Sequence, residues 1–175
     1  LRPEYGLAAN NLGTALERLD DMPAAKKSYE RAVKINHLHA EPHNNLGAIQ
    51  VAEGDVDGAC RSFEAAIAAR PDFVEAHYNL STLKKYTEND PHYKTLEEIA
   101  AKAPSLPEDA RMRYWFAIGK AREDVGHYDD AFTAYMRGNM LKRMTIKYEE
   151  PAIEKNTADV ISRFDERVAA RIGTC

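Results

Sequence analysis

Few residues in this chain have the types and spacing that chemistry needs. His37, His39 and His43 are the densest group of potential metal ligands, but their steps do not fit a helical ligand pair and no nearby cysteine completes a zinc pattern. The chain has no glycine-rich phosphate loop, and no serine or cysteine stands in the sequence context of a nucleophile. We therefore expect no catalysis by this chain, no cofactor and no bound metal.

Asparagine recurs at one position along the chain. Asn11, Asn45 and Asn79 are spaced by 34 residues, and Asn10 and Asn44 precede the first two. An exposed asparagine amide donates to a carbonyl and accepts from an N–H, so a column of them could hold an extended peptide through its backbone. With helices about 8–10 Å apart and about 3.3 Å per peptide residue, one asparagine would meet roughly every third residue. Alternatively, these asparagines cap or bridge neighbouring helices and the groove binds no peptide.

Other side chains are expected to flank this groove. They are Thr14, Glu17, Arg18, Tyr78, Thr82, Lys85 and Tyr86. The asparagine column stops near Phe116 and Ala117, which replace the polar pair in the fourth unit. We therefore expect that end of the groove to be more apolar.

The elements that must position these residues repeat with a fixed period. Leu12-Gly13, Leu46-Gly47 and Leu80-Ser81 are spaced by 34 residues, and Ile118-Gly119 follows 38 residues after the third. A period of this length indicates stacked helical hairpins, each helix burying one apolar face. The predicted fold is all-α, a right-handed superhelical solenoid of about four hairpins with a C-terminal helix.

The period and the turn signals set the expected boundaries of the units. These are 1–5 for the tail of a preceding repeat, 6–39, 40–73, 74–111 and 112–147 for repeats 1 to 4, and 148–175 for a capping or linker helix. The third unit is four residues longer, in the loop Pro104–Pro107. We interpret the chain as part of a longer protein.

The third unit also departs most from the pattern. Its first helix should run from Phe73 to about Tyr86, and Asp90 is placed to cap a second helix that begins at Pro91. Ser81 stands where the other units have glycine. We therefore expect the second helix of this unit to be shifted or rotated.

Mid-helix glycines mark where two helices should cross closely. Each costs about 1 kcal/mol of helix propensity relative to alanine, which a neighbouring side chain in the vacated space can offset. The glycines are Gly13, Gly47 and Gly119, and the aromatic residues expected to fill the gap between successive hairpins are Tyr29, Phe63 and Tyr135.

This arrangement resembles the tetratricopeptide repeat family. Trp115, Ile118, Gly119, Ala131 and Tyr135 of the fourth unit stand at the family's signature spacing. In such arrays the first helix of each pair lines the inner, concave surface, so the resemblance implies a module that binds a protein or peptide. The asparagine column resembles the asparagine ladders of some tetratricopeptide and armadillo superhelices.

A narrower resemblance concerns the second half of the chain. The runs Tyr78–Tyr86, Pro104–Pro107, Phe116–Ala121 and Arg137–Asn139 look like bacterial proteins that join these repeats to a sulfotransferase domain. That domain uses phosphoadenosine phosphosulfate, and its binding loop would begin shortly beyond Cys175. Nothing in this chain matches the loop, so the resemblance implies a non-catalytic region of a larger sulfotransferase-like protein.

Composition and net charge limit the kinds of partner that we expect for this chain. The chain has 175 residues with a net charge of −4, which gives no reason to expect nucleic acid or an acidic membrane as partner. No apolar stretch is long enough for a transmembrane helix, and two cysteines fit a reducing cytoplasm. We expect a protein or peptide partner. The alternative is a structural or dimerising scaffold, a homodimer formed through the exposed repeat ends.

Overall fold

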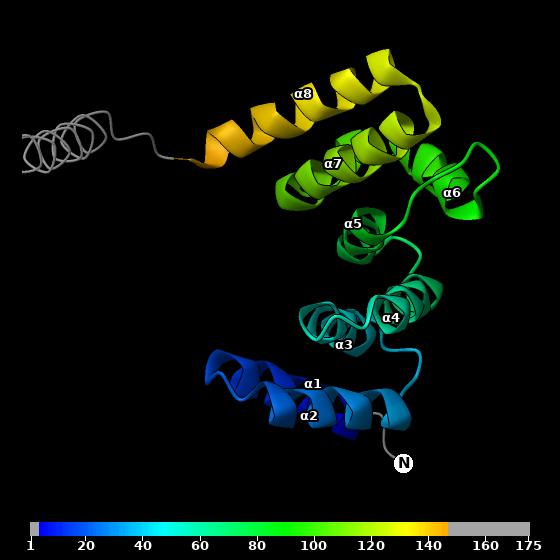
Figure 1. The fold of residues 1–175 in the computed structure, drawn as a ribbon. Helices are drawn as coiled ribbons and strands as arrows, with labels where there is room; N and C mark the ends of the chain where they lie inside the picture. The colour runs from blue at the N-terminus through cyan, green and yellow to red at the C-terminus, as the bar shows by residue number, and fades with distance from the viewer. Residues whose placement is uncertain (1–3, 147–175) are drawn as a thin grey trace, which may run out of the picture. The chain divides into compact units, whose positions relative to one another are not determined.

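The computed structural model describes residues 4–146 (Figure 1). Over this range it contains only helices, so the predicted all-α class is confirmed. The elements are α1 Glu4–Arg18, α2 Met22–Ile35, α3 Ala40–Ala52, α4 Val56–Ala69, α5 Val74–Leu83, α6 Pro91–Ala100, a 3-10 turn Ala103–Ser105, α7 Glu108–Val125 and α8 Tyr128–Thr145. The expected helix at 148–175 lies outside the described residues.

Contacts divide the chain into two units, Leu1–Lys142 and Arg143–Cys175. The packing described below is that within the first unit. Of the second, the structure describes only Arg143–Ile146, which holds the last turn of α8. The predicted repeat boundaries, such as 39/40 and 73/74, stay a prediction.

Helices α1 to α4 form two successive hairpins. Helix α1 packs against α2 and α3 against α4, while α2 contacts α3 and α4 contacts α5. Each second helix begins at an aspartate whose carboxylate accepts a backbone N–H: Asp21 from Ala24, and Asp55 from Gly58. Such a cap satisfies an N–H that the first helical turn leaves without a partner.

The close crossing within each hairpin is made at its glycine. A Cβ added to Gly13 would lie 2.5 Å from the ring of Tyr29, and one on Gly47 would lie 2.6 Å from the ring of Phe63. The aromatic ring therefore occupies the space that glycine vacates in its own hairpin, as well as packing toward the next one, where Tyr29 meets Ile49. Gly119 and Tyr135 repeat the arrangement between α7 and α8.

In the third unit the two helices, α5 and α6, do not pack closely on each other, and we call this unit opened. Helix α5 packs against α4 and α7, and α6 packs against α7, so α5 and α6 do not form a close hairpin like the first two (Figure 1). The shift expected for α6 is thus seen. The helix expected to reach Tyr86 ends at Leu83, because Tyr86 turns into the core and its N–H donates to Asp124 of α7 at 3.0 Å. Asp90 caps α6 as predicted.

The largest apolar core lies around α7. Tyr114, Trp115 and Ile118 of α7 pack with Leu96 of α6 and Ala134 of α8. The Tyr114 hydroxyl donates to the buried carbonyl of Leu96 at 3.1 Å. This core fixes α6 and α8 on α7 and leaves α1, α3 and α5 to carry the asparagine column.

Candidate peptide-binding surface

The asparagines join consecutive first helices through side-chain bridges. The Asn45 amide donates to Oδ1 of Asn10 at 3.3 Å, and the Asn79 amide donates to Oδ1 of Asn44 at 2.9 Å. Asn10 and Asn44 are buried, with 8% and 3% of their surface exposed. The same bridge therefore recurs one repeat along, from α1 to α3 and from α3 to α5.

These bridges divide the column into two kinds of residue. Asn10 and Asn44 hold neighbouring helices together, as the alternative interpretation predicted, and their amide oxygens are occupied. Asn45 and Asn79 are half-buried, and their amide oxygens are not used in the bridges. Asn11 is exposed. Contact with a peptide stays a prediction, and Asn11, Asn45 and Asn79 are the side chains placed to make it.

Thr14 and Glu17 are oriented by a tyrosine from α2. The Tyr29 hydroxyl donates to Oε2 of Glu17 at 2.8 Å and lies 3.3 Å from Oγ1 of Thr14. Burial raises the pKa of Tyr29 above its ordinary value, so the hydroxyl keeps its proton as a donor. The side chains of both expected groove residues, Thr14 and Glu17, are thus held in one orientation.

The tyrosine–glutamate pair has a sequence signal that the repeat analysis missed. Tyr135 of α8 donates to Glu123 of α7 at 2.7 Å. These two residues are separated by 12 positions, as Tyr29 and Glu17 are. In the second hairpin Phe63 lacks a hydroxyl, and the residue 12 positions earlier is Val51. Where the tyrosine is replaced by phenylalanine, the glutamate 12 positions earlier is replaced by an apolar residue as well.

The other expected groove residues fall into two groups. Arg18, Thr82 and Lys85 are exposed and Tyr78 is half-buried, so they stay available beside the column. Tyr86 is only 2% exposed, and the expectation that it flanks the groove needs correction.

In the fourth unit, the apolar pair Phe116 and Ala117 is only partly exposed beside the column. Ala117 is buried, and half-buried Phe116 packs toward α8, where a Cβ on Gly138 would lie 3.2 Å from its ring. Because these side chains belong to the packing of α7 on α8, they add little apolar surface beside the column.

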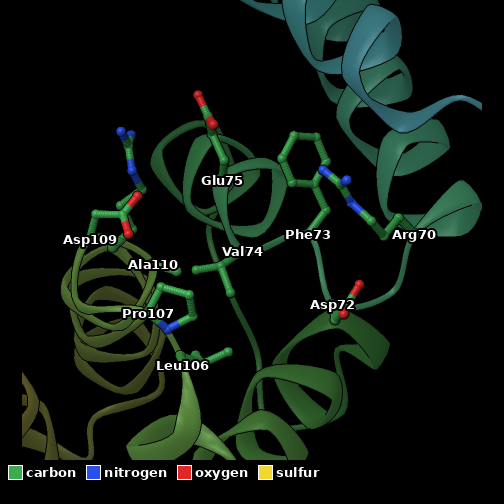
Figure 2. A pocket seen from close by; sticks show the side chains of 10 residues that line it. Arg70, Asp72, Phe73, Val74, Glu75, Leu106, Pro107, Asp109 and Ala110 are labelled. Carbon is green, nitrogen blue, oxygen red and sulfur yellow. The ribbon is translucent and has the colours of Figure 1, made fainter.

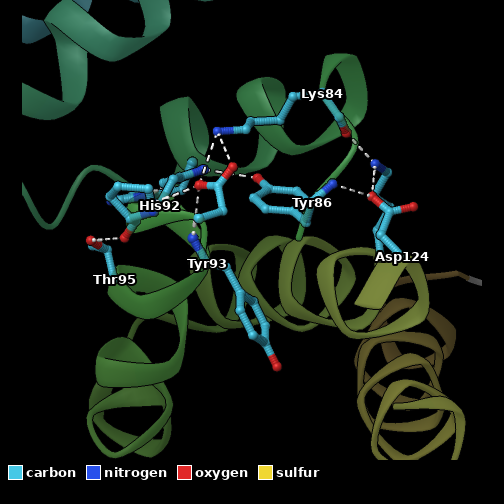
Figure 3. A network of polar contacts seen from close by, with 10 residues as sticks. Lys84, Tyr86, His92, Tyr93, Thr95 and Asp124 are labelled. Carbon is cyan, nitrogen blue, oxygen red and sulfur yellow. Dashed lines mark hydrogen bonds and ion pairs between the residues drawn. The ribbon is translucent and has the colours of Figure 1, made fainter. Parts of the chain in front are cut away.

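Tyr86 belongs to a buried hydrogen-bond chain (Figure 3). His77 Nε2 lies 2.9 Å from the carbonyl oxygen of Pro71, and because a carbonyl only accepts, this nitrogen carries the proton. His77 Nδ1 then accepts from His92 Nε2 at 2.8 Å, and His92 Nδ1 accepts from the Tyr86 hydroxyl at 2.8 Å. One carbonyl therefore sets the donor direction of the whole chain, with both imidazoles neutral.

Burial keeps these groups uncharged. His77 is fully buried, and burial lowers its pKa. Burial, with His77 and the Lys84 ammonium beside it, lowers the pKa of His92 to about 3. The two imidazole rings are nearly parallel, with 10° between their planes and centroids 5.0 Å apart, which is the edge-to-edge arrangement of rings joined by a hydrogen bond. The network therefore joins α5, the segment 84–90 and α6 without carrying charge at neutral pH.

Two lysines cover the ring of Tyr86. The ammonium groups of Lys84 and Lys120 each lie 5.2 Å from the ring centroid. Lys84 forms an ion pair with Asp90 at 2.8 Å, and Lys120 forms one with Asp124 at 2.5 Å. Lys120 also donates to the carbonyl of Lys84. These contacts hold the segment 84–90 in place, a structural role.

Part of the chain matches a known repeat family. Residues 10–72 and 44–83 match the tetratricopeptide repeat model. The second match ends at Leu83, where α5 ends and the third unit opens. The predicted resemblance to this family is thus confirmed over the first two hairpins and α5.

Solved structures extend the likeness to most of the chain. The "Crystal structure of MamA" aligns with a TM-score of 0.58 and 20% identity, covering 83% of this chain and 83% of that one. The "Crystal structure of MamA protein" aligns with a TM-score of 0.57 and 21% identity, covering 84% and 78%. At this identity the likeness shows the fold, a tetratricopeptide-like solenoid. No curated protein sequence matches the chain.

A hollow of about 300 Å³ lies beside the start of α5 and of α7 (Figure 2). Its floor is apolar, with Val74 and Leu106, and its rim carries charges of both signs. The Arg70 guanidinium lies 3.8 Å from the ring centroid of Phe73 and forms an ion pair with Glu41. Because the rim charges are mixed, this hollow does not indicate one class of ligand.

The histidine group of the second hairpin is engaged locally. His43 Nε2 lies 3.0 Å from the carbonyl oxygen of His37, and His39 pairs with Glu41 at 2.9 Å. Among residues 4–146 no three His, Cys, Asp or Glu side chains are grouped as metal ligands. In the same range, every helix is too short or too polar to cross a membrane.

Proposed function

We propose that this chain is a protein-interaction module that binds an extended peptide or protein segment along α1, α3 and α5. The observation that supports it is the recurrence of Asn11, Asn45 and Asn79 at one position of three consecutive first helices. The bridges from Asn10 and Asn44 orient two of these amides before a ligand arrives. A side chain that is already ordered loses less entropy on binding.

Backbone contacts alone would make the module tolerant of ligand sequence. An asparagine amide recognises the peptide group, which every residue shares. Selectivity would then come from the flanking side chains. The exposed cations Arg18 and Lys85 outnumber the one exposed anion among the flanking residues, Glu17, so the proposed ligand is an extended segment that carries acidic residues.

Alanine substitution tests the proposal. A peptide selected from a displayed library of unstructured sequences is titrated against Asn11→Ala, Asn45→Ala and Asn79→Ala, with exposed Asn89→Ala in the 84–90 segment as control. We expect each column variant to weaken binding about five- to tenfold, the value of about one hydrogen bond, and the control to bind normally.

Asn11→Ala is the cleanest of the three variants, because Asn11 takes part in neither bridge. The other two are checked for unchanged helix content and melting temperature before titration. Unchanged affinity in all three column variants would refute the asparagine surface as the binding site.

A narrower proposal concerns the context of the module. We propose that it is the repeat region of a bacterial, cytoplasmic sulfotransferase-like protein; the alternative to peptide binding is that it serves there as a structural or dimerising scaffold. The sequence runs Tyr78–Tyr86 and Phe116–Ala121 support this. The reading frame of the gene tests it: a phosphosulfate-binding loop downstream of Cys175 supports the proposal, and a frame without one contradicts it.

A further inference from the structure

A row of large apolar side chains runs along the solvent-facing side of α8. Its buried side carries small residues, Ala131, Ala134 and Gly138, that pack toward α7. On the opposite side, five large apolar side chains are between 55% and 72% exposed: Tyr128, Phe132, Met136, Met140 and Met144. A continuous apolar surface of this kind on a helix marks an interaction site.

A seven-residue step organises this face. Asp129, Met136 and Arg143 are seven residues apart, close to two helical turns, so they lie on one line along the exposed side of α8. Phe132 and Met140 stand four residues before and after Met136, on either side of that line. The line thus has an acid at one end, an apolar centre and a base at the other end.

We propose that this face binds a second copy of the chain, with two α8 helices antiparallel about a two-fold axis at Met136. In an isologous contact residue i meets j and j meets i. Because Asp129 and Arg143 are equally far from Met136, each Asp129 meets the partner's Arg143, and Phe132 meets the partner's Met140. A parallel pair would instead place like charges together.

The charges on this line are available for such a contact. Within residues 4–146 neither Asp129 nor Arg143 forms an ion pair. Arg137 is already engaged, since its guanidinium lies 4.7 Å from the ring centroid of Trp115. Charge complementarity at both ends of the contact fixes its register and direction.

The expected dimer is weak. One helix against one helix buries on the order of 1,000 Å² in total, at the low end of specific interfaces. Association should therefore depend on concentration in the micromolar range or above. The face is on α8, whereas the proposed peptide surface is on α1, α3 and α5, so either proposal can fail without the other.

Analytical ultracentrifugation over a wide range of concentration, with charge-reversed variants, tests the dimer. We expect a monomer–dimer equilibrium in the unchanged protein. Asp129→Arg alone and Arg143→Asp alone should each weaken it about tenfold or more, because each places like charges together at both ends. The double variant D129R/R143D should restore it, since opposite charges then face each other again.

Two further variants, one inside the α8 face and one outside it, test whether the dimer forms through this face. Met136→Lys should abolish the dimer, while Leu19→Glu, an exposed position 76% accessible after α1, should not change it. Circular dichroism verifies that all variants keep their helix content. The proposal is overturned if the protein is monomeric at every concentration, as it would be if residues 147–175 or another partner covered α8. It is equally overturned by a dimer that the charge swap fails to restore, or by one that Leu19→Glu disrupts.

Discussion

In the hydrogen-bond chain from Tyr86 to Pro71, each imidazole uses its Nδ1 as an acceptor, so neither Nδ1 carries a proton. His92 Nδ1 accepts from Tyr86, and His77 Nδ1 accepts from His92. If His92 Nδ1 gained a proton, the Tyr86 oxygen would have to accept from it, and the buried Tyr86 O–H would lose its acceptor. If His77 Nδ1 gained a proton, its N–H would face the N–H of His92. Protonation of either histidine therefore weakens the contacts between α5, α6 and the segment that joins them.

Stability should therefore fall as the solution is acidified. The folded pKa of His92, about 3, lies below its ordinary value of 6.5, so the unfolded chain binds the proton first. The stabilisation by neutral His92 is complete above pH 6.5 and is lost as the pH falls toward 3. At pH 5 the loss is about 2 kcal/mol. Urea denaturation at pH 7 and pH 5 measures the difference.

His92→Gln is the matched control, because glutamine accepts and donates but does not titrate. Its free energy of unfolding should change less between pH 7 and pH 5 than that of the unchanged protein. Asp90 and Glu97 act mainly at lower pH, since their folded pKa values are below their ordinary ones. An equal pH dependence in both proteins would contradict the role of His92.

The glycine crossings give a second prediction at this scale. Alanine at Gly13 gains about 1 kcal/mol of helix propensity, yet its Cβ would lie 2.5 Å from the Tyr29 ring. Overpacking of a core typically costs about 1–3 kcal/mol, so we expect Gly13→Ala to be less stable in urea. Gly138→Ala, with a nearest contact of 3.2 Å, should lose less. A stabilised Gly13→Ala protein would refute the close crossing.

At the scale of the elements, the segment 84–90 replaces the close hairpin contact that α5 and α6 lack. Its Tyr86 is covered by two lysines and joined to α6 through His92. Helix α6 is joined to α7 by two hydrogen bonds of 2.8 Å from Arg122 to Glu97. The opened unit is thus held by polar contacts where the first two hairpins use a glycine and an aromatic ring.

Removing the Tyr86 hydroxyl should therefore loosen this unit. Tyr86→Phe keeps the ring but leaves His92 Nδ1 buried without a donor, which costs about 1–3 kcal/mol. Tyr128→Phe, exposed on α8, should change the free energy of unfolding by less than about 0.5 kcal/mol. Hydrogen exchange localises the effect to α6, and an unchanged exchange rate there in Tyr86→Phe would speak against this role.

The sequence predicts those elements whose contacts recur with the period. The glycine–aromatic crossings repeat at 34 residues, and so do the caps Asp21 and Asp55, although only Asp90 was predicted as a cap. The asparagine bridges also recur, each joining residues 35 apart, so the signal for them was present.

The opened third unit could not be predicted in detail. His77 and His92 come from α5 and α6, which do not form a close hairpin like the first two, so their contact does not follow from the period. The end of α5 at Leu83 depends on Asp124, 38 residues after Tyr86. Such contacts are set by tertiary packing, which overrides the local helix preference of Lys84–Tyr86.

In the molecule as a whole, the two proposed binding faces lie on different helices. The asparagine column is on α1, α3 and α5, and the apolar line is on α8. Their ligands should therefore bind without affecting each other. We expect Met136→Lys to bind the selected peptide with the affinity of the unchanged protein in calorimetric titration, and a tenfold change would show that the two faces are coupled.

The proposed function requires that the asparagine column contacts a ligand. Nitrogen-15 NMR of the side-chain amides during titration with the selected peptide tests it most directly. We expect the amide signals of Asn11, Asn45 and Asn79 to shift with a common dissociation constant while that of Asn89 stays in place. Binding of the peptide with those three signals unchanged would contradict it.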